Sequence, residues 1–319
     1  FQAEDGIRDS VASRGLGDVY KRQALGPFFM LKNKITSQML CIFIYAVTFY
    51  LSYVLTPESI SNIWLKITIW HLYATVFIYI FSVIIGNSSL YDPFWSVAPI
   101  PIVVYLATQF ENSLLLKILV LFPIVFWALR LTRNWIISWK GFEHEDFRYI
   151  DLKNTTKFKA EINNFFGIHL FPTFIVNLGL VPLLYILTNN ISVNNGLIFA
   201  SIFTFSAVIL ETVSDEQMRE FKKNLDNKNK TMKYKLWKYS RHPNYLGEIL
   251  FWFGIYFMGL SSGLAPVWTI ICPLTMLALF VFVSCPMMDE RSLKNRPCLL
   301  YTSDAADEGL GVDLGGRRI

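Results

Sequence analysis

The segment at 239–248, YSRHPNYLGE, holds the densest group of residues that could do chemistry. Pro243 suits the first turn of a helix, where its missing N–H would be unpaired anyway, so Ser240 or His242 would form the cap. A helix start offers free N–H groups and partial positive charge, and Arg241 and His242 add donors. These features favour an anion such as a phosphate or carboxylate. The alternative is a cap that binds no ligand.

Glu248 closes this segment and is followed by an apolar run. An ionised carboxylate in the middle of a membrane helix costs about 2.5–3.5 kcal/mol, so we expect a basic residue to hold it. Tyr245 lies three residues earlier, on the same helix face, and its phenol could contact a cofactor or a substrate carbonyl. Both residues are therefore candidate catalytic residues facing one pocket. Alternatively, Tyr245 is an interfacial anchor and Glu248 reaches water.

A second group begins with LRLTRNW, which contains Arg130, Arg133 and Asn134, and continues with GFEHEDFRY at 141–149. Arginines at the end of an apolar helix often serve only to set its orientation in a membrane. The acids and histidine of the second string are consecutive, so their side chains diverge, and no second cluster has metal-ligand spacing. We predict no metal site.

Two smaller groups add acidic candidates. Glu211, Asp215 and Arg219 recur every four residues, so they share a helix face. They could hold a ribose hydroxyl and a phosphate, or they could form an exposed ladder of ion pairs. Asp92, in YDPFWS, is a turn signal before proline, but beside Tyr and Trp it could also line a pocket. The lone His71 and His169 are expected to be packing residues.

The elements that position these groups are predicted to be membrane helices. The chain has 319 residues, 53% of them hydrophobic, and only 17% are charged against about 25% in soluble domains. The sequence therefore indicates an all-α, polytopic membrane bundle of six to eight helices, because a spanning helix needs roughly 20 apolar residues. The candidate spans are 36–55, 63–85, 96–110, 114–131, 166–188, 196–213, 246–260 and 264–285.

Charge is concentrated in two loops. The segment 130–165 holds seven basic residues and the segment 215–245 holds nine, whereas the connections at 56–62, 111–113, 189–195 and 261–263 hold none. By the positive-inside rule both basic loops face the cytoplasm. The same rule explains the net charge of +5 without nucleic acid.

The two ends differ in character from the rest. Residues 1–23 and 298–319 have no apolar periodicity and resemble translated adapter sequence. We expect one transmembrane domain over 24–297, truncated at its C-terminus. The apolar runs do not alternate, which argues against a β-barrel, and the chain lacks the glycine-rich motifs of Rossmann and P-loop domains.

Taken together, the strings YDPFWS, LRLTRNW with GFEHEDFRY, SDEQMREF and WKYSRHPNYLGE resemble the steroid 5-alpha-reductase-like family, in its little-characterised multi-span branch. The resemblance covers about 85–297. The string RHPNYLGE by itself also resembles isoprenylcysteine carboxyl methyltransferases and phospholipid methyltransferases, which use S-adenosylmethionine.

The resemblance implies a reductase that binds NADPH between membrane helices from the cytoplasmic side and transfers hydride to the C=C bond of a lipid, sterol or steroid-like enone. The family's own catalytic Glu/Tyr pair has no match in this sequence, so Tyr245, Glu248 and Asp92 are candidate catalytic residues on the local arguments given above. The candidate cofactor contacts are Arg133, Asn134, Asp215, Arg219, Arg241, His242, Asn244 and Tyr245. The alternatives are a prenyl- or lipid-directed methyltransferase and a non-catalytic membrane protein.

The charge pattern makes a topological prediction that cysteine labelling in intact cells can check. Lys157→Cys and Lys228→Cys should both be protected from a membrane-impermeant thiol reagent until the cytoplasmic side is opened, because both basic loops carry the same orientation signal. Labelling of the two positions from opposite sides would contradict the prediction.

Overall fold

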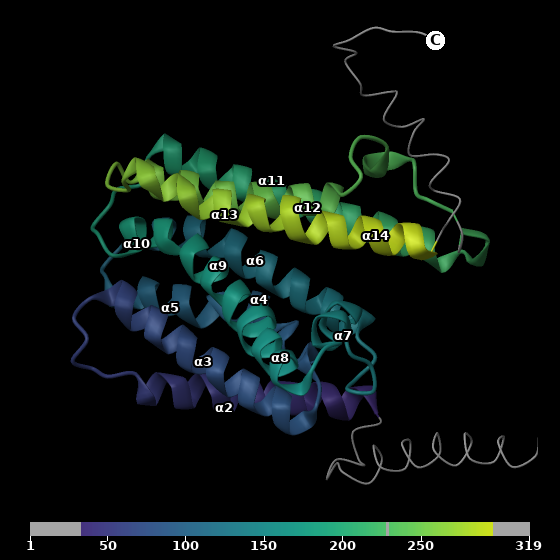
Figure 1. Cartoon of the computed structure of the whole chain (residues 1–319). Coiled ribbons are helices and arrows are strands. Elements are labelled where there is room, and N and C mark those ends of the chain that lie inside the picture. Colours follow the sequence, from purple (N-terminus) through teal and green to yellow (C-terminus); the bar gives the residue numbers. More distant parts are fainter. Residues whose placement is uncertain (1–32, 228–229, 296–319) are drawn as a thin grey trace, which may run out of the picture. The chain divides into compact units, whose positions relative to one another are not determined.

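The computed structural model describes residues 33–227 and 230–295, and within them it contains helices and no strands (Figure 1). Seven helices in this part of the chain are long and apolar enough to cross a membrane, which confirms the predicted all-α membrane bundle. The segments 1–23 and 298–319, predicted to be foreign, lie outside the described residues.

The chain divides into two compact units, each built from several stretches of sequence. Unit 1 takes its described residues from the chain up to Ser59 and from Ile69–Phe94 and Asn134–Leu170. Unit 2 comprises Ile60–Thr68, Trp95–Arg133 and the chain from Phe171 onward. The residues with candidate chemistry fall in both units.

Unit 1 is built on the spanning helices α2 (Lys34–Leu55) and α3 (Ile63–Ile85), of which α3 contributes its part after Thr68. Short helices complete it: η1 (Ser88–Tyr91), α7 (Phe147–Lys153), α8 (Lys157–Ile162) and the π-helix η2 (Asn163–Leu170). The core is aromatic, with Phe49 stacked on Phe94 and Tyr45 edge-on to both. The Tyr45 phenol donates to the carbonyl of Leu90 over 2.6 Å, which joins α2 to η1.

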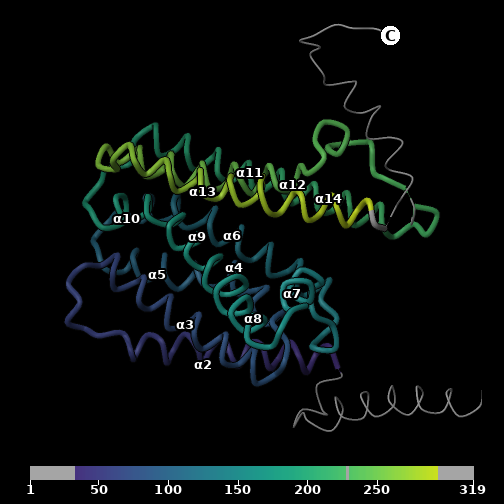
Figure 2. The backbone as a smooth tube through the Cα atoms, in the orientation of Figure 1, coloured from purple at the N-terminus to yellow at the C-terminus, as the bar shows by residue number. Residues whose placement is uncertain are grey.

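Unit 2 contains the remaining long helices, which are traced as tubes in Figure 2. Its main helical segments in chain order are α5 (Pro99–Gln109), α6 (Leu114–Ser138, up to Arg133), α9 (Phe171–Gly179), α10 (Val181–Leu187), α11 (Asn195–Lys223), α12 (Pro243–Ser261), α13 (Ile271–Leu279), η6 (Phe280–Ser284) and α14 (Cys285–Asn295). The long helices α11 and α12 pack along each other, and α13 packs on α12.

All eight predicted spans are helical, but their limits differ from the prediction. The spans predicted to end at 131 and 213 continue to Ser138 and Lys223, because the charged residues on the extra turns pair with one another. The span predicted at 166–188 lies in Lys157–Leu187, one of the seven spanning segments, which is built from α8, the π-helix η2, α9 and α10. The helix α12 has 19 residues and is not among the seven that meet the spanning criterion.

Two glycines allow α12 to approach α11 closely. A Cβ atom added at Gly247 would lie 2.7 Å from Glu211 Cβ, and one at Gly254 would lie 2.9 Å from Thr204 Cα. Small residues at such contacts let helix backbones come together in membrane proteins. The register that they fix brings Glu211 of α11 beside the N-terminal turns of α12.

This contact predicts that a larger side chain at Gly254 will separate the two helices. Gly254→Val should lower the free energy of unfolding by about 1–3 kcal/mol through overpacking, measured as a lower melting temperature in detergent. Gly167→Ala is the matched control, because a Cβ there meets nothing within 4 Å. Equal melting of both variants would contradict the close packing.

Candidate functional site

The centre of unit 2 is an arginine paired with two carboxylates. Arg130 on α6 forms ion pairs with Glu211 and Asp215, one turn apart on α11, and its Nη1 lies 2.8 Å from Asp215 Oδ2. The side chains of Arg130 and Glu211 are only 5% and 6% exposed. The structure therefore excludes the interpretation of Glu211 and Asp215 as an exposed ladder of ion pairs.

Glu248 is held by two tryptophans. Its carboxylate oxygens accept hydrogen bonds from the indole N–H groups of Trp127 on α6, over 2.8 Å, and Trp252 on α12, over 2.9 Å. The residue is 3% exposed. The prediction that a basic residue would hold Glu248 is wrong, because Arg130 is taken by Glu211 and Asp215. Two indole donors stabilise the buried carboxylate instead.

Asn244, in the first turn of α12, extends the cluster toward the helix start. Its amide nitrogen donates to Asp215 Oδ1 over 3.1 Å. Its side-chain oxygen is buried and has no hydrogen-bond partner among the described residues. A buried acceptor of this kind is costly unless a donor reaches it, so the position suits a hydroxyl or amide N–H of a ligand.

The start of α12 follows the prediction in outline. His242 is the N-cap residue and Pro243 begins the helix, although the imidazole makes no capping hydrogen bond. Instead, His242 Nε2 lies 2.9 Å from Asp289 of α14, which Arg241 also approaches at 4.0 Å. The His242 ring stacks on Tyr245, with ring centroids 5.1 Å apart.

Tyr245 also contacts Phe280 of η6, with centroids 4.9 Å apart. These two ring contacts are with the start of α12 and with η6, whereas Glu248 contacts Trp127 on α6. These contacts of Tyr245 and Glu248 lie on different elements, whereas the sequence predicted that both side chains face one pocket; a shared pocket stays a prediction. Their shared helix face is broad enough for each side chain to reach a different neighbour.

The last turns of α11 carry a second, more exposed ion-pair group. Glu216 accepts hydrogen bonds from Arg133, over 2.9 Å, and from Arg219 one turn further along α11. Because Arg133 ends the unit 2 part of α6, this contact places the ends of α6 and α11 side by side. The two basic loops therefore start from the same end of the unit, while their cytoplasmic location stays a prediction.

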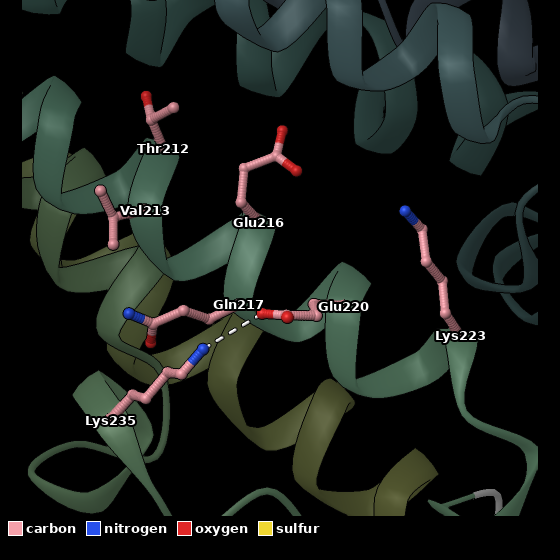
Figure 3. Close-up of a pocket in the computed structure, with 7 residues that line it drawn as sticks. All are labelled: Thr212, Val213, Glu216, Gln217, Glu220, Lys223 and Lys235. Carbon is pink, nitrogen blue, oxygen red and sulfur yellow. Dashed lines mark hydrogen bonds and ion pairs between the residues drawn. The ribbon is translucent and has the colours of Figure 1, made fainter.

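Next to this group, α11 lines a pocket of about 540 Å³. Figure 3 shows Thr212, Glu216 and Lys223 pointing to one side of the helix, and Gln217 and Glu220 turned toward Lys235. The Lys235 ammonium pairs with Glu220 at 3.1 Å, Gln217 accepts from the backbone N–H of Leu236, and Trp237 donates to the carbonyl of Ser214. These three bonds hold 235–237 against α11 and so position the segment that leads to His242.

In unit 1, Asp92 accepts a hydrogen bond from the Tyr149 phenol over 2.6 Å. Burial raises the pKa of Tyr149 well above its usual value, and the charge of Asp92 raises it further. The phenol therefore keeps its proton at neutral pH and donates a hydrogen bond to Asp92. Asp146, at the start of α7, holds the neighbouring Arg148 over 2.8 Å.

The two lone histidines are packing residues, as predicted. His71 is buried against Phe94, and His169 is buried with its ring nitrogens on the Asn164 carbonyl and the Ser82 hydroxyl. No cluster of three His, Cys, Asp or Glu side chains suited to a metal ion occurs in the described parts of the chain.

Most of the predicted cofactor residues therefore gather at one end of unit 2, on α6, α11 and α12. Asn134 and Asp92 belong to unit 1. The residues that sequence reasoning missed are Trp127, Trp252 and Asp289. The ion pair of Arg130 with Glu211 could have been predicted, because both residues lie in apolar runs and opposite charges inside a membrane usually pair.

A model of the family described as "Protein of unknown function (DUF1295)" matches residues 78–302 of the chain. The chain belongs to this family, whose domain is of the steroid 5-alpha-reductase-like kind. The match contains every candidate site residue named above. Neither a curated protein nor a solved structure matches the chain.

The arrangement predicts different outcomes for two arginines three residues apart on α6. Arg130→Met should lower the free energy of unfolding by about 3–5 kcal/mol, because it leaves Glu211 and Asp215 buried without their cation. Arg133→Met removes a pair whose side chains are half exposed, so it should cost at most about 1 kcal/mol. Thermal unfolding in detergent measures both. Equal stability of the two variants would show that Arg130 does not stabilise the bundle.

Proposed function

We propose that the chain is a membrane-embedded reductase that uses NADPH to reduce the C=C bond of a lipid, sterol or steroid-like enone. The proposal is carried by one observation. In a member of this family, the polar and charged side chains of three helices gather at one end of a bundle that is otherwise apolar.

The residues in this cluster fit a nicotinamide dinucleotide in their chemistry. Asn244 has a buried amide oxygen without a donor in the described chain, which suits a ribose hydroxyl or the nicotinamide carboxamide. Asp215 lies beside it and accepts from the Asn244 amide. Arg133, Arg219 and Arg241 provide guanidinium groups for phosphates, which they bind through paired N–H donors.

NADPH supplies a hydride when it is bound. The chain's own residues would orient the nucleotide, and a phenol would hydrogen-bond the conjugated carbonyl to stabilise its developing negative charge. We assign this donor role to Tyr245, whose ring is fixed between His242 and Phe280. Asp92, which accepts a hydrogen bond from Tyr149 in unit 1, is a catalytic candidate on the sequence alone. Glu248 accepts hydrogen bonds from two indole N–H groups, and its role is to position α12 against α6.

A hydrophobic substrate fits a protein whose helices lie in a bilayer. An enone with a sterol or other lipid skeleton partitions into the membrane, so it can reach a site between helices without crossing water. The exact substrate is left to the assay, for which a panel of lipid enones is appropriate.

A methyltransferase acting on prenyl or lipid groups is the second candidate. It is favoured by RHPNYLGE, which opens α12 and resembles the motif of enzymes that use S-adenosylmethionine. The same cluster of Asp215, Asn244 and His242 could bind either ligand, so the structure by itself does not separate them. A membrane protein without catalysis is the third alternative.

The decisive experiment is a titration of the detergent-purified chain with NADPH and with S-adenosylmethionine. We expect NADPH to bind and S-adenosylmethionine not to bind. Binding of S-adenosylmethionine alone would move the protein to the methyltransferases, and binding of neither would favour a non-catalytic role.

A variant of the phenol tests the assignment of Tyr245. Tyr245→Phe should reduce turnover of a reducible enone by about tenfold or more while the melting temperature is kept, because the ring contacts remain and only a donor is lost. Tyr239→Phe is the matched control, since Tyr239 is 81% exposed in the same segment. Unchanged turnover in Tyr245→Phe would show that this residue is a membrane anchor.

A further inference from the structure

The buried cluster of unit 2 contains more carboxylates than positive charges. Arg130 forms ion pairs with Glu211 and Asp215, and Arg219 attracts Asp215 as a second cation. The third carboxylate, Glu248, accepts its hydrogen bonds from two neutral indole groups. Two arginines thus stand against three acids, which leaves the cluster one positive charge short.

The described residues around the cluster do not supply the missing charge. Arg133 and Glu216, which border it, add one charge of each sign. The helices α9, α10 and α13, which also pack on α12, contain no acidic or basic residue, and their titratable side chains are Tyr185 and Cys272. An uncompensated buried charge is costly, so the cluster needs one further positive charge from another source.

The side chains of Glu211 and Glu248 meet where Gly247 lets α11 and α12 approach closely. A Cβ atom added at Gly247 would lie 2.7 Å from Glu211 Cβ. The two carboxyl groups are within hydrogen-bonding distance of each other. Ionised carboxylates are acceptors only, so a hydrogen bond between them requires a proton on one of the two. Like charges this close do not both persist in a buried site.

The two oxygens of Glu211 support the same conclusion. Oε1 pairs with Arg130, whereas Oε2 is buried and meets no donor among the described residues. A buried acceptor without a donor is destabilising. A proton held between Glu211 and Glu248 gives the pair the donor that it lacks. It also needs no cavity, whereas a metal ion needs a cluster of ligands, and none occurs in the part of the chain that the structure describes.

We infer that Glu211 and Glu248 bind one proton between them, and that this proton holds the start of α12 against α11. With the proton in place, Arg130 and Arg219 balance the two negative charges that remain. Without it, two adjacent buried anions repel each other and weaken the contact between the helices. The inference goes beyond the proposed function and does not depend on which cofactor the chain uses.

Infrared spectroscopy of the full chain in nanodiscs tests the protonation directly, because a protonated carboxyl group has a C=O band separate from the bands of a carboxylate. At neutral pH we expect such a band in the parent. Glu211→Gln and Glu248→Gln should each remove it, because the remaining acids of the cluster then equal the arginines in number. A band of unchanged intensity in both variants would overturn the inference.

The matched control is Glu216→Gln, which removes a carboxylate from the next turn of α11. Glu216 is 46% exposed and pairs with Arg133 and Arg219, so it is ionised and contributes no protonated band. The band of the parent should therefore be kept in this variant. Its loss would place the proton outside the pair and contradict the inference.

The pH dependence of stability tests the role of the proton in the helix contact. An unfolded glutamate ionises near pH 4.3 or about that value, so at neutral pH the folded parent holds one proton more than the unfolded chain. Stability therefore falls as the pH rises, and the unfolding equilibrium constant should increase by up to about tenfold per pH unit until the shared proton is lost. Reversible unfolding in mixed micelles measures this constant.

Glu211→Gln should remove this pH dependence while stability at neutral pH is kept. Its amide oxygen can accept from Arg130, and its N–H groups can donate to Glu248 in place of the shared proton. Glu216→Gln should keep the pH dependence of the parent. An equal pH dependence in the parent and in Glu211→Gln would overturn the inference, as would a loss of stability in Glu211→Gln as large as that of Arg130→Met.

The parent alone decides the matter if neither variant of the pair folds. A protonated-carboxyl band that disappears over the same pH range in which stability falls supports the inference, and the absence of such a band at neutral pH overturns it. None of these measurements contains a nucleotide or a substrate. Their outcome is therefore separate from the titrations that test the proposed function.

Discussion

The Arg130 guanidinium is buried and forms ion pairs with Glu211 and Asp215 in the interior of unit 2. Removing the arginine, or removing its two carboxylates, would leave a buried charge uncompensated. Such a change is among the most destabilising that a protein interior can undergo. The pairing therefore fixes how α6 and α11 register against each other. Asp215 in turn accepts from Asn244, so the first turn of α12 is set by the same charge.

Glu248 extends the frame one turn further along the same face of α12. Because Arg130 is already occupied, two indole N–H groups supply its hydrogen bonds, and the rings of Trp127 and Trp252 also pack edge to face. Glycines 247 and 254 let α12 come close enough to α11 for this network to form. This network holds α6, α11 and α12 together, and the more exposed residues at the helix ends are arranged around it.

The charges of α11 divide by helix face into structural and accessible groups. One face carries Glu211 and Asp215 into the buried cluster. Another holds 235–237 through Ser214, Gln217 and Glu220. Glu216 and Lys223 face the pocket that α11 lines. A single helix thus joins the bundle and positions the segment before α12.

The sequence by itself determined the membrane class, the positions of the helices and the gathering of polar residues in a few motifs, because hydrophobicity, charge and proline act locally along the chain. It also indicated Pro243 at the first turn of α12 and packing roles for His71 and His169. Only the tertiary structure decided the partners. Which cation meets Glu211, and whether Glu248 takes an arginine or two tryptophans, depends on helix rotation and register. These are set by contacts between residues such as Trp127 and Glu248, which lie 121 positions apart.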